Sequence, residues 1–255
     1  MNRDKNTEFG ERIIIEKGFM RVARSPHKVI LPEILDEDFA YLTGYHLGDG
    51  YLEDSLKSQE NRGKSGYEID YADSDKQQLL LINSIFNDKF AFNFRIYKRP
   101  TANLYIARAH CKVIHIFLNK RLGIPLGEKN IINMPNWILN EKKFISCFLS
   151  GFFDAEGDVG KTGNRVVKGK KYYKLRIQLT QRDKNILLEI KTILKETFGI
   201  VSDIHPKWHQ DAYILRIGSA RMAKKFKNQI NFRNSTKRGK LALLISEFDK
   251  KHATG

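Results

Sequence analysis

The chain has 255 residues, of which 41% are hydrophobic, so it is not a disordered protein, and we expect one large domain or two fused smaller ones. Lys and Arg outnumber Asp and Glu by 45 to 29, and the net charge of +16 favours polyanionic partners, nucleic acid before acidic membrane. Two cysteines are too few for a disulfide framework, and His110, Cys111 and His115 lack the second ligand pair of a zinc site.

The N-terminal part of the chain, residues 1–34, has no counterpart in the rest of the sequence and is interpreted as an extension. Its first residues, MNRDKNTEFGERIII, carry acids early and have no long apolar core, which argues against a secretory signal. No apolar run approaches the roughly 20 residues that span a bilayer. We therefore expect an intracellular protein, cytoplasmic in a prokaryote or organellar, and not a secreted one.

The first predicted helix ends in LTGYHLGDG, residues 42–50, and has three acids, residues 36–38, at its start, where the helix dipole favours anions. Asp49 stands in the last turn, where backbone carbonyls point outward and the dipole is negative. Gly50 follows it as a typical helix stop. An anion at the C-terminal end of a helix is electrostatically unfavourable, so the position of Asp49 predicts a neighbouring cation.

The segments after this helix recur later in the chain. Residues 71–86 and 179–194 align without a gap at an offset of 108, and YIAR at 105–108 matches YILR at 213–216. At an offset of 107, Asp49 aligns with Glu156 of the segment FLSGFFDAEGDVG. The chain thus contains two related halves, and a repeat of this kind takes precedence over single-segment predictions.

Each half predicts the element order α-β-β-α-β-β-α. In the second half, Asn140 is a plausible helix N-cap, and KLRIQLT at 174–180 alternates as a half-buried strand does. Polar turns are expected over 57–66 and 161–171, and a closing basic helix over 219–230. We predict an α+β fold of two pseudo-symmetric halves, each a four-stranded antiparallel sheet with helices on one face, with boundaries 1–34 (extension), 35–125 (first half), 126–139 (linker) and 140–255 (second half).

The open faces of the two sheets are rich in basic, amide and aromatic side chains, which predicts a saddle for nucleic acid. The residues expected to contact DNA are Arg95, Tyr97, Arg99, Lys174, Arg176, Gln178, His205, Lys207 and Arg216.

Small residues at four-residue spacing, Gly44 and Gly48 in one helix and Gly151 and Ala155 in the other, allow the two helix backbones to pack closely. Asp49 and Glu156 then approach each other, and their repulsion is relieved by a divalent cation. Carboxylate oxygens select Mg²⁺, which suits phosphodiester hydrolysis.

LTGYHLGDG and LSGFFDAEG resemble the two motifs of the LAGLIDADG homing endonucleases in their single-chain, pseudo-symmetric form. The likeness runs from about Phe39 to about Leu244 and includes LTQRDK, GIPLGEK and FRNSTKRGKL. It implies a monomeric DNA endonuclease that uses Mg²⁺, for which Mn²⁺ can substitute, and makes a staggered double-strand break with 3′ overhangs in a long asymmetric site.

The resemblance also implies roles for individual residues. Asp49 and Glu156 bind the metals, together with the backbone carbonyls of Gly48 and Ala155, and Gln181 and Arg182 organise the hydrolytic water. The first half has Asp73 and Ser74 at the matching positions, so the residues beside the hydrolytic water differ between the halves. Lys161 is a further candidate for organising this water. Glu68 and Asp70 on the first sheet either accept a hydrogen bond from cytosine N4 or neutralise a neighbouring Arg.

Two other functions fit the same scaffold: a maturase that binds structured intron RNA, and a DNA-binding regulator without catalysis. Retention of both acids argues against the regulator, because binding alone does not need them. Cleavage of DNA excludes the regulator, whereas tight binding of a structured RNA without cleavage of any DNA would favour the maturase.

Overall fold

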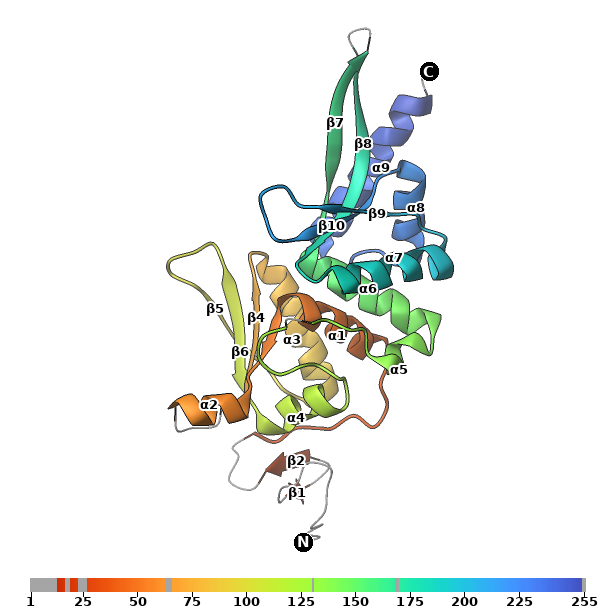
Figure 1. Cartoon of the computed structure of the whole chain (residues 1–255). Coiled ribbons are helices and arrows are strands. Elements are labelled where there is room, and N and C mark those ends of the chain that lie inside the picture. The colour runs from red at the N-terminus through yellow and green to blue at the C-terminus, as the bar shows by residue number, and fades with distance from the viewer. Residues whose placement is uncertain are drawn as a thin grey trace. The chain divides into compact units, whose positions relative to one another are not determined.

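A computed structural model describes residues 13–16, 19–22, 27–62, 66–129, 131–167 and 170–253. The chain divides into two units, Met1–Lys129 and Asn130–Gly255 (Figure 1). Among the described residues, no helix combines the length and the apolar character that crossing a membrane requires.

The first unit contains a small hairpin and a four-stranded antiparallel sheet in the order β3-β4-β6-β5. Helices α1 and α3 pack against this sheet. Its elements are β1 (Ile13–Glu16), β2 (Phe19–Val22), α1 (Glu37–Asp49), β3 (Gly50–Leu52), α2 (Ser55–Arg62), β4 (Glu68–Asp73), α3 (Lys76–Phe90), β5 (Arg95–Lys98), β6 (Tyr105–His110) and α4 (Lys112–Lys120).

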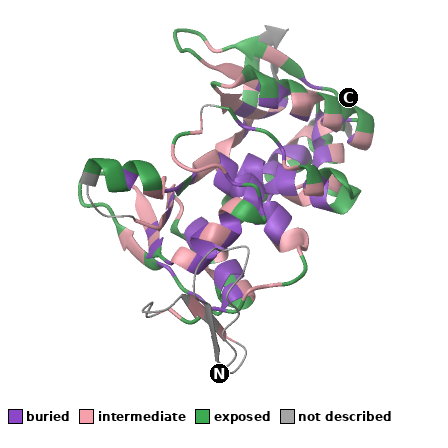
Figure 2. Ribbon diagram, turned by 60° about the horizontal axis from the view of Figure 1, so that its bottom comes forward, coloured by how far each residue is buried: buried purple, intermediate pink, exposed green. Residues whose placement is uncertain are grey.

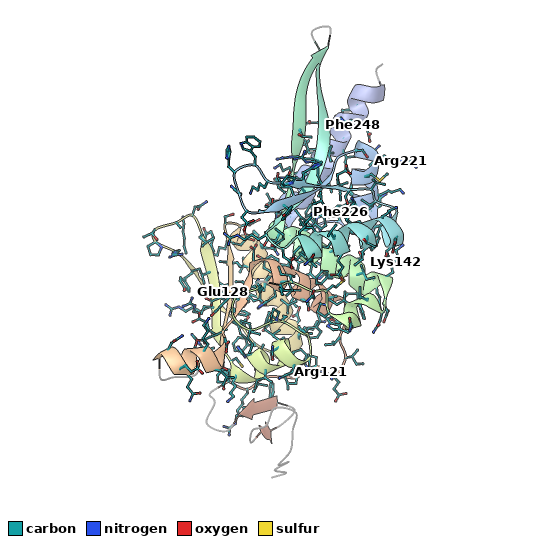
Figure 3. All side chains as sticks on the ribbon, viewed as in Figure 1. Arg121, Glu128, Lys142, Arg221, Phe226 and Phe248 are labelled. Atoms are coloured by element: carbon teal, nitrogen blue, oxygen red, sulfur yellow. The ribbon has the colours of Figure 1, made fainter. Side chains whose placement is uncertain are left out.

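The second unit repeats this plan with a sheet in the equivalent order β7-β8-β10-β9, covered by α6, α7, α8 and α9. Phe226 of α8, labelled in Figure 3, contacts the rings of Phe153 and Phe232 in its core, with centroids 4.8 and 5.2 Å away. The elements are α5 (Asn136–Leu139), α6 (Lys142–Glu156), β7 (Gly157–Val167), β8 (Lys170–Gln181), α7 (Lys184–Phe198), β9 (Asp203–Pro206), β10 (Tyr213–Ile217), α8 (Ala220–Gln229) and α9 (Ser235–Ala253).

The predicted α+β fold and the repeated element order are confirmed. Strand β8 buries Leu175, Ile177 and Leu179, while the intervening Arg176 and Gln178 remain half-exposed, as the alternation predicted. Both α3 and α7 end at a left-handed residue, and these residues, Ala91 and Gly199, are again 108 positions apart. The repeat therefore extends to helix caps that sequence alignment alone does not identify.

Three local predictions are wrong. The segment 57–66 was expected to be a polar turn, but its residues as far as Arg62 belong to helix α2. The helix starts here because the Asp54 carboxylate accepts hydrogen bonds from the amides of Leu56 and Lys57. Most of the turn expected over 161–171 is strand, since β7 and β8 pair as far as Val167 and Lys170. Asn140 does not cap α6; it lies at the C-terminal end of the short helix α5, and α6 begins after Glu141.

Helix α1 starts where the acids predicted it to start, because the Asp36 carboxylate accepts hydrogen bonds from the amides of Asp38 and Phe39. Lys89 forms ion pairs with Asp36 and Asp38 and fixes this end of the helix on α3. From Phe39 to Leu47 every residue of α1 is buried, and buried residues are purple in Figure 2. The helix that carries Asp49 is thus enclosed in the core of its unit over most of its length.

The interior of this unit contains a histidine, His46, whose Nδ1 lies 2.9 Å from the hydroxyl oxygen of Tyr71. Burial, and then the charge of Lys129, lower the pKa of His46 well below its ordinary value of 6.5. The folded protein keeps this ring neutral, whereas the unfolded chain binds a proton below pH 6.5. The free energy of unfolding should therefore fall as the pH drops below about 6.5, by at most about 1.4 kcal/mol per pH unit from this group.

Urea unfolding at pH 7.5, 6.5 and 5.5 measures this loss, and NMR of the histidine rings assigns it. We expect the His46 ring signals not to titrate through pH 6.5. A His46 ring that protonates at its ordinary pKa in the folded protein would contradict the prediction.

Candidate functional site

The two predicted acids are the last residues of their helices, Asp49 of α1 and Glu156 of α6, and both are half-buried. Each helix passes directly into the first strand of its sheet through a glycine, Gly50 or Gly157. These glycines have φ values of −85° and −89°, so they do not end the helix through a left-handed conformation. They are needed for space, because a Cβ at Gly157 would lie 2.2 Å from the carbonyl oxygen of Phe153.

The carbonyls at the end of α1 bind a lysine ammonium. Lys129 Nζ donates hydrogen bonds to the carbonyl oxygens of His46, Gly48 and Gly50 at 2.8, 2.7 and 2.7 Å. These oxygens lie at the negative end of the helix dipole, where a cation is stabilising. Figure 3 labels Glu128, the residue next to this lysine.

The end of α6 has the same arrangement. Lys237 Nζ hydrogen-bonds to the carbonyl oxygen of Asp154 and contacts those of Phe153 and Ala155 at 3.4 Å each. Lys129 and Lys237 are 108 positions apart, the offset of the repeat. Neither lysine was predicted as a site residue, although both lie in the segments GIPLGEK and FRNSTKRGKL and their matching offset could have identified them.

The segments that carry these lysines are attached in different ways. In the first unit, the amide of Gly127 donates to the carbonyl of Leu52 in β3 at 2.7 Å. In the second, the buried Asp154 carboxylate accepts from the amides of Arg233 and Asn234 at 3.0 and 2.9 Å. In both units a lysine from a distant segment is therefore fixed against the end of the motif helix.

Asp73, the first-unit counterpart of Gln181, lies close to the same helix end. The Tyr45 hydroxyl of α1 donates a hydrogen bond to the Asp73 carboxylate at 2.9 Å. Burial, and then the charges of Asp73 and Asp49, raise the pKa of Tyr45 well above 10.0. Asp73, where a glutamine stands in the second unit, thus has a local structural role: it accepts a hydrogen bond from a buried phenol.

In the second unit, Gln181 is the last residue of β8 and is half-buried, and Arg182 follows it as an exposed residue. Lys161 of β7 forms an ion pair with Glu247 of α9, with 2.7 Å between Nζ and Oε2. Lys161 therefore reaches toward α9, while Lys237 contacts the end of α6. The catalytic role expected for Lys161 stays a prediction.

The donor atoms at each helix end fit a hard divalent cation. Each end offers a half-buried carboxylate beside the carbonyl of the preceding residue, Gly48 or Ala155, and such oxygens are the ligands that Mg²⁺ prefers. Among the described residues, no group of three or more His, Cys, Asp or Glu side chains gathers to hold a metal alone. A metal at these positions would complete its coordination with water and phosphate oxygens, as Mg²⁺ commonly does.

The residues expected to contact DNA belong mainly to strands β5, β8, β9 and β10. Gln178 and Arg216 are paired across β8 and β10, and His205 pairs with Ile214 across β9 and β10. Arg95, Arg99, Lys174 and His205 are exposed, whereas Tyr97, Arg176, Gln178, Lys207 and Arg216 are half-buried. Within each unit, these residues lie on the sheet or on the segments that continue its strands.

The acids on these faces are paired with arginines. Arg108 of β6 binds Asp70 and Glu68 of β4, and in the second unit Arg176 donates to Asp158 at 2.9 Å and to Gln178 at 3.0 Å. Of the two roles left open for Glu68 and Asp70, neutralisation of a neighbouring arginine is the one that the structure shows. The guanidinium groups are thereby held in fixed positions.

Comparison with models of protein families finds a match, which lies in the second unit. Its residues 143–231 match the family model described as a LAGLIDADG-like domain. The second unit is therefore similar to a LAGLIDADG-like domain over this segment. Among curated proteins, none matches this chain.

The LAGLIDADG fold also covers the first unit, because solved structures that match the chain extend over both. A structure of I-DmoI in complex with DNA and Mn has 19% sequence identity and a TM-score of 0.52, and covers 76% of this chain and 96% of that one. I-LtrWI bound to target DNA has 15% identity, a TM-score of 0.56 and coverage of 84% and 91%. I-SmaMI bound to uncleaved DNA with calcium has 13% identity, a TM-score of 0.58 and coverage of 86% and 93%. The chain thus shares the fold of single-chain LAGLIDADG homing endonucleases.

Proposed function

We propose that this protein is a homing endonuclease that makes a staggered double-strand break in a long asymmetric DNA site by divalent-metal-dependent hydrolysis. The observation that carries the proposal is the repeated helix end, where the last residue is an acid, the carbonyl before it contacts a lysine ammonium, and a strand of the sheet follows directly. The net charge of +16 and the complexes with DNA named for I-DmoI, I-LtrWI and I-SmaMI support DNA as the partner.

Asp49 with the Gly48 carbonyl would hold Mg²⁺ in one unit, and Glu156 with the Ala155 carbonyl in the other. The metal supplies charge neutralisation for the scissile phosphate and lowers the pKa of the attacking water. Gln181 and Arg182 orient the water in the second unit, and the sheets lie in the major groove and read sequence. Each unit acts on one strand, as a monomer with two catalytic centres requires.

Lys129 and Lys237 act as positioning residues for these centres. Each ammonium stabilises the carbonyls of the last helical turn and offsets the repulsion between the acid and the negative helix end. The acid and its neighbouring carbonyl are therefore held in place before metal and DNA bind, which lowers the cost of assembling the centre.

Removal of divalent metal should stop cleavage completely while leaving binding of the target DNA measurable. The test incubates the full chain with a randomised duplex library in Mg²⁺, Mn²⁺ or EDTA, and sequences the ends that are formed. We expect ends with 3′ overhangs at one sequence in Mg²⁺ and Mn²⁺ and none in EDTA. Cleavage that persists in EDTA, or tight binding of structured RNA with no cleavage of any DNA, would overturn the proposal.

A further inference from the structure

Arg108 of β6 is held by two carboxylates from the neighbouring strand. Its Nε donates to both oxygens of Asp70 at 2.9 and 3.0 Å, and its Nη2 binds the same carboxylate. Nη2 also lies 3.3 Å from Glu68 Oε1. The antiparallel register places Asp70 directly opposite Arg108 and Glu68 opposite His110, so the strand pairing itself creates this arrangement.

The guanidinium is the outer member of this group. The side chain of Arg108 is 40% exposed, whereas those of Glu68 and Asp70 are 20% and 16% exposed. Within the described part of the chain, its Nη1 nitrogen makes no hydrogen bond or ion pair. The carboxylates thus bind the inner edge of the guanidinium, and its remaining N–H groups are available to a ligand.

Arg108 also lines a pocket of about 510 Å³ on the same unit. Two of the residues expected to contact DNA, Arg95 and Tyr97, line this pocket as well, together with His110. Arg95 lies opposite Arg108 in the β5–β6 register. The fixed guanidinium therefore faces an open recess beside other candidate DNA contacts.

The repeat supplies an arginine at the matching position of the second sheet, Arg216. It is half-buried, and its Nε is buried without a hydrogen-bond partner among the described residues. Arg176 and Gln178 replace the two acids at the positions that correspond to Glu68 and Asp70. Arg216 therefore lacks the carboxylate partners of Arg108, whose Nη1 stays directed to a base-edge acceptor such as O6 or N7 of guanine.

We infer that Arg108, held by Asp70 and Glu68, is a specificity-determining residue that reads a guanine in the half-site bound by the first unit. This inference rests on the proposed function. It assigns to the acids on the first sheet a positioning role, and it makes the two halves of the protein unequal: the Arg108 position discriminates between bases, and the Arg216 position contributes affinity.

The test compares Arg108→Lys with the matched control Arg216→Lys in the full chain. Both variants keep the charge and remove the planar guanidinium. Wild-type protein first selects its site from a randomised duplex library with Ca²⁺, and binding is then measured for each single-base substitution of that site. Arg108→Lys should lose its preference for guanine at one position by about tenfold or more, with the other positions unchanged. Arg216→Lys should alter binding to all sequences alike, by less than about threefold.

Asp70→Asn provides a second variant that leaves Arg108 in place. It should weaken discrimination at the same base position, because the guanidinium is no longer held. An unchanged base profile in Arg108→Lys, or an equal weakening at every position, would overturn the inference while leaving the proposed function intact. If wild-type protein selects no DNA sequence, the proposed function fails and this inference fails with it.

Discussion

Substitution of Asp49 by Asn should produce an enzyme that nicks its DNA target, because one strand is no longer cleaved while the other still is. Substitution of Glu156 by Gln should leave the opposite strand uncut. An amide keeps the size of the side chain but removes the charge that binds a divalent cation. We expect cleavage of the affected strand to fall at least about 10³-fold, a barrier increase of about 4 kcal/mol.

A supercoiled plasmid that carries the selected site separates these outcomes, because nicked and linear products migrate differently. Wild type should give linear DNA, each single variant nicked DNA, and the double variant supercoiled DNA that is still bound. Asp88→Asn and Glu196→Gln, which change exposed acids on α3 and α7, are the matched controls and should behave as wild type. Linear product from either site variant would show that Asp49 and Glu156 do not serve separate strands.

Much of the fold was predictable because the same pattern occurs twice. Alternation in KLRIQLT identified the buried face of β8, since a strand with one covered face must alternate. The turn expected over 161–171 was wrong because polar residues in a long hairpin resemble loop residues. Nothing in the local sequence around Lys170 distinguishes a strand that continues from one that ends.

The candidate site was likewise predicted only in part from the sequence. Asp49 and Glu156 stood out because an acid followed by glycine occurred at both helix ends. Lys129 and Lys237 lie 80 or more positions after the helices whose carbonyls they bind, and only the folded chain brings them there. The pairing of Arg108 with Asp70 likewise depends on the register between β4 and β6, which residue types alone do not fix.

Lys129→Met and Lys237→Met should each slow cleavage of one strand, the former the strand served by Asp49 and the latter the strand served by Glu156. Methionine retains the length of the side chain but leaves the helix-end carbonyls without their cation. Misplacement of the acid by about 1 Å is enough to cost on the order of 10²-fold in rate. Loss of the charged hydrogen bonds should also lower the free energy of unfolding by about 1–3 kcal/mol.

Strand-specific single-turnover cleavage and urea unfolding measure the two effects in the same variants. Lys120→Met and Lys195→Met remove exposed lysines from α4 and α7 and serve as controls for the change in net charge. A general electrostatic role in binding DNA would make all four variants weaken binding alike and slow both strands equally. A positioning role makes only the helix-end lysines selective for one strand, because each ammonium binds the end of a single motif helix. Equal slowing of both strands by Lys129→Met would therefore assign that lysine to the DNA-binding surface and remove it from the metal centre.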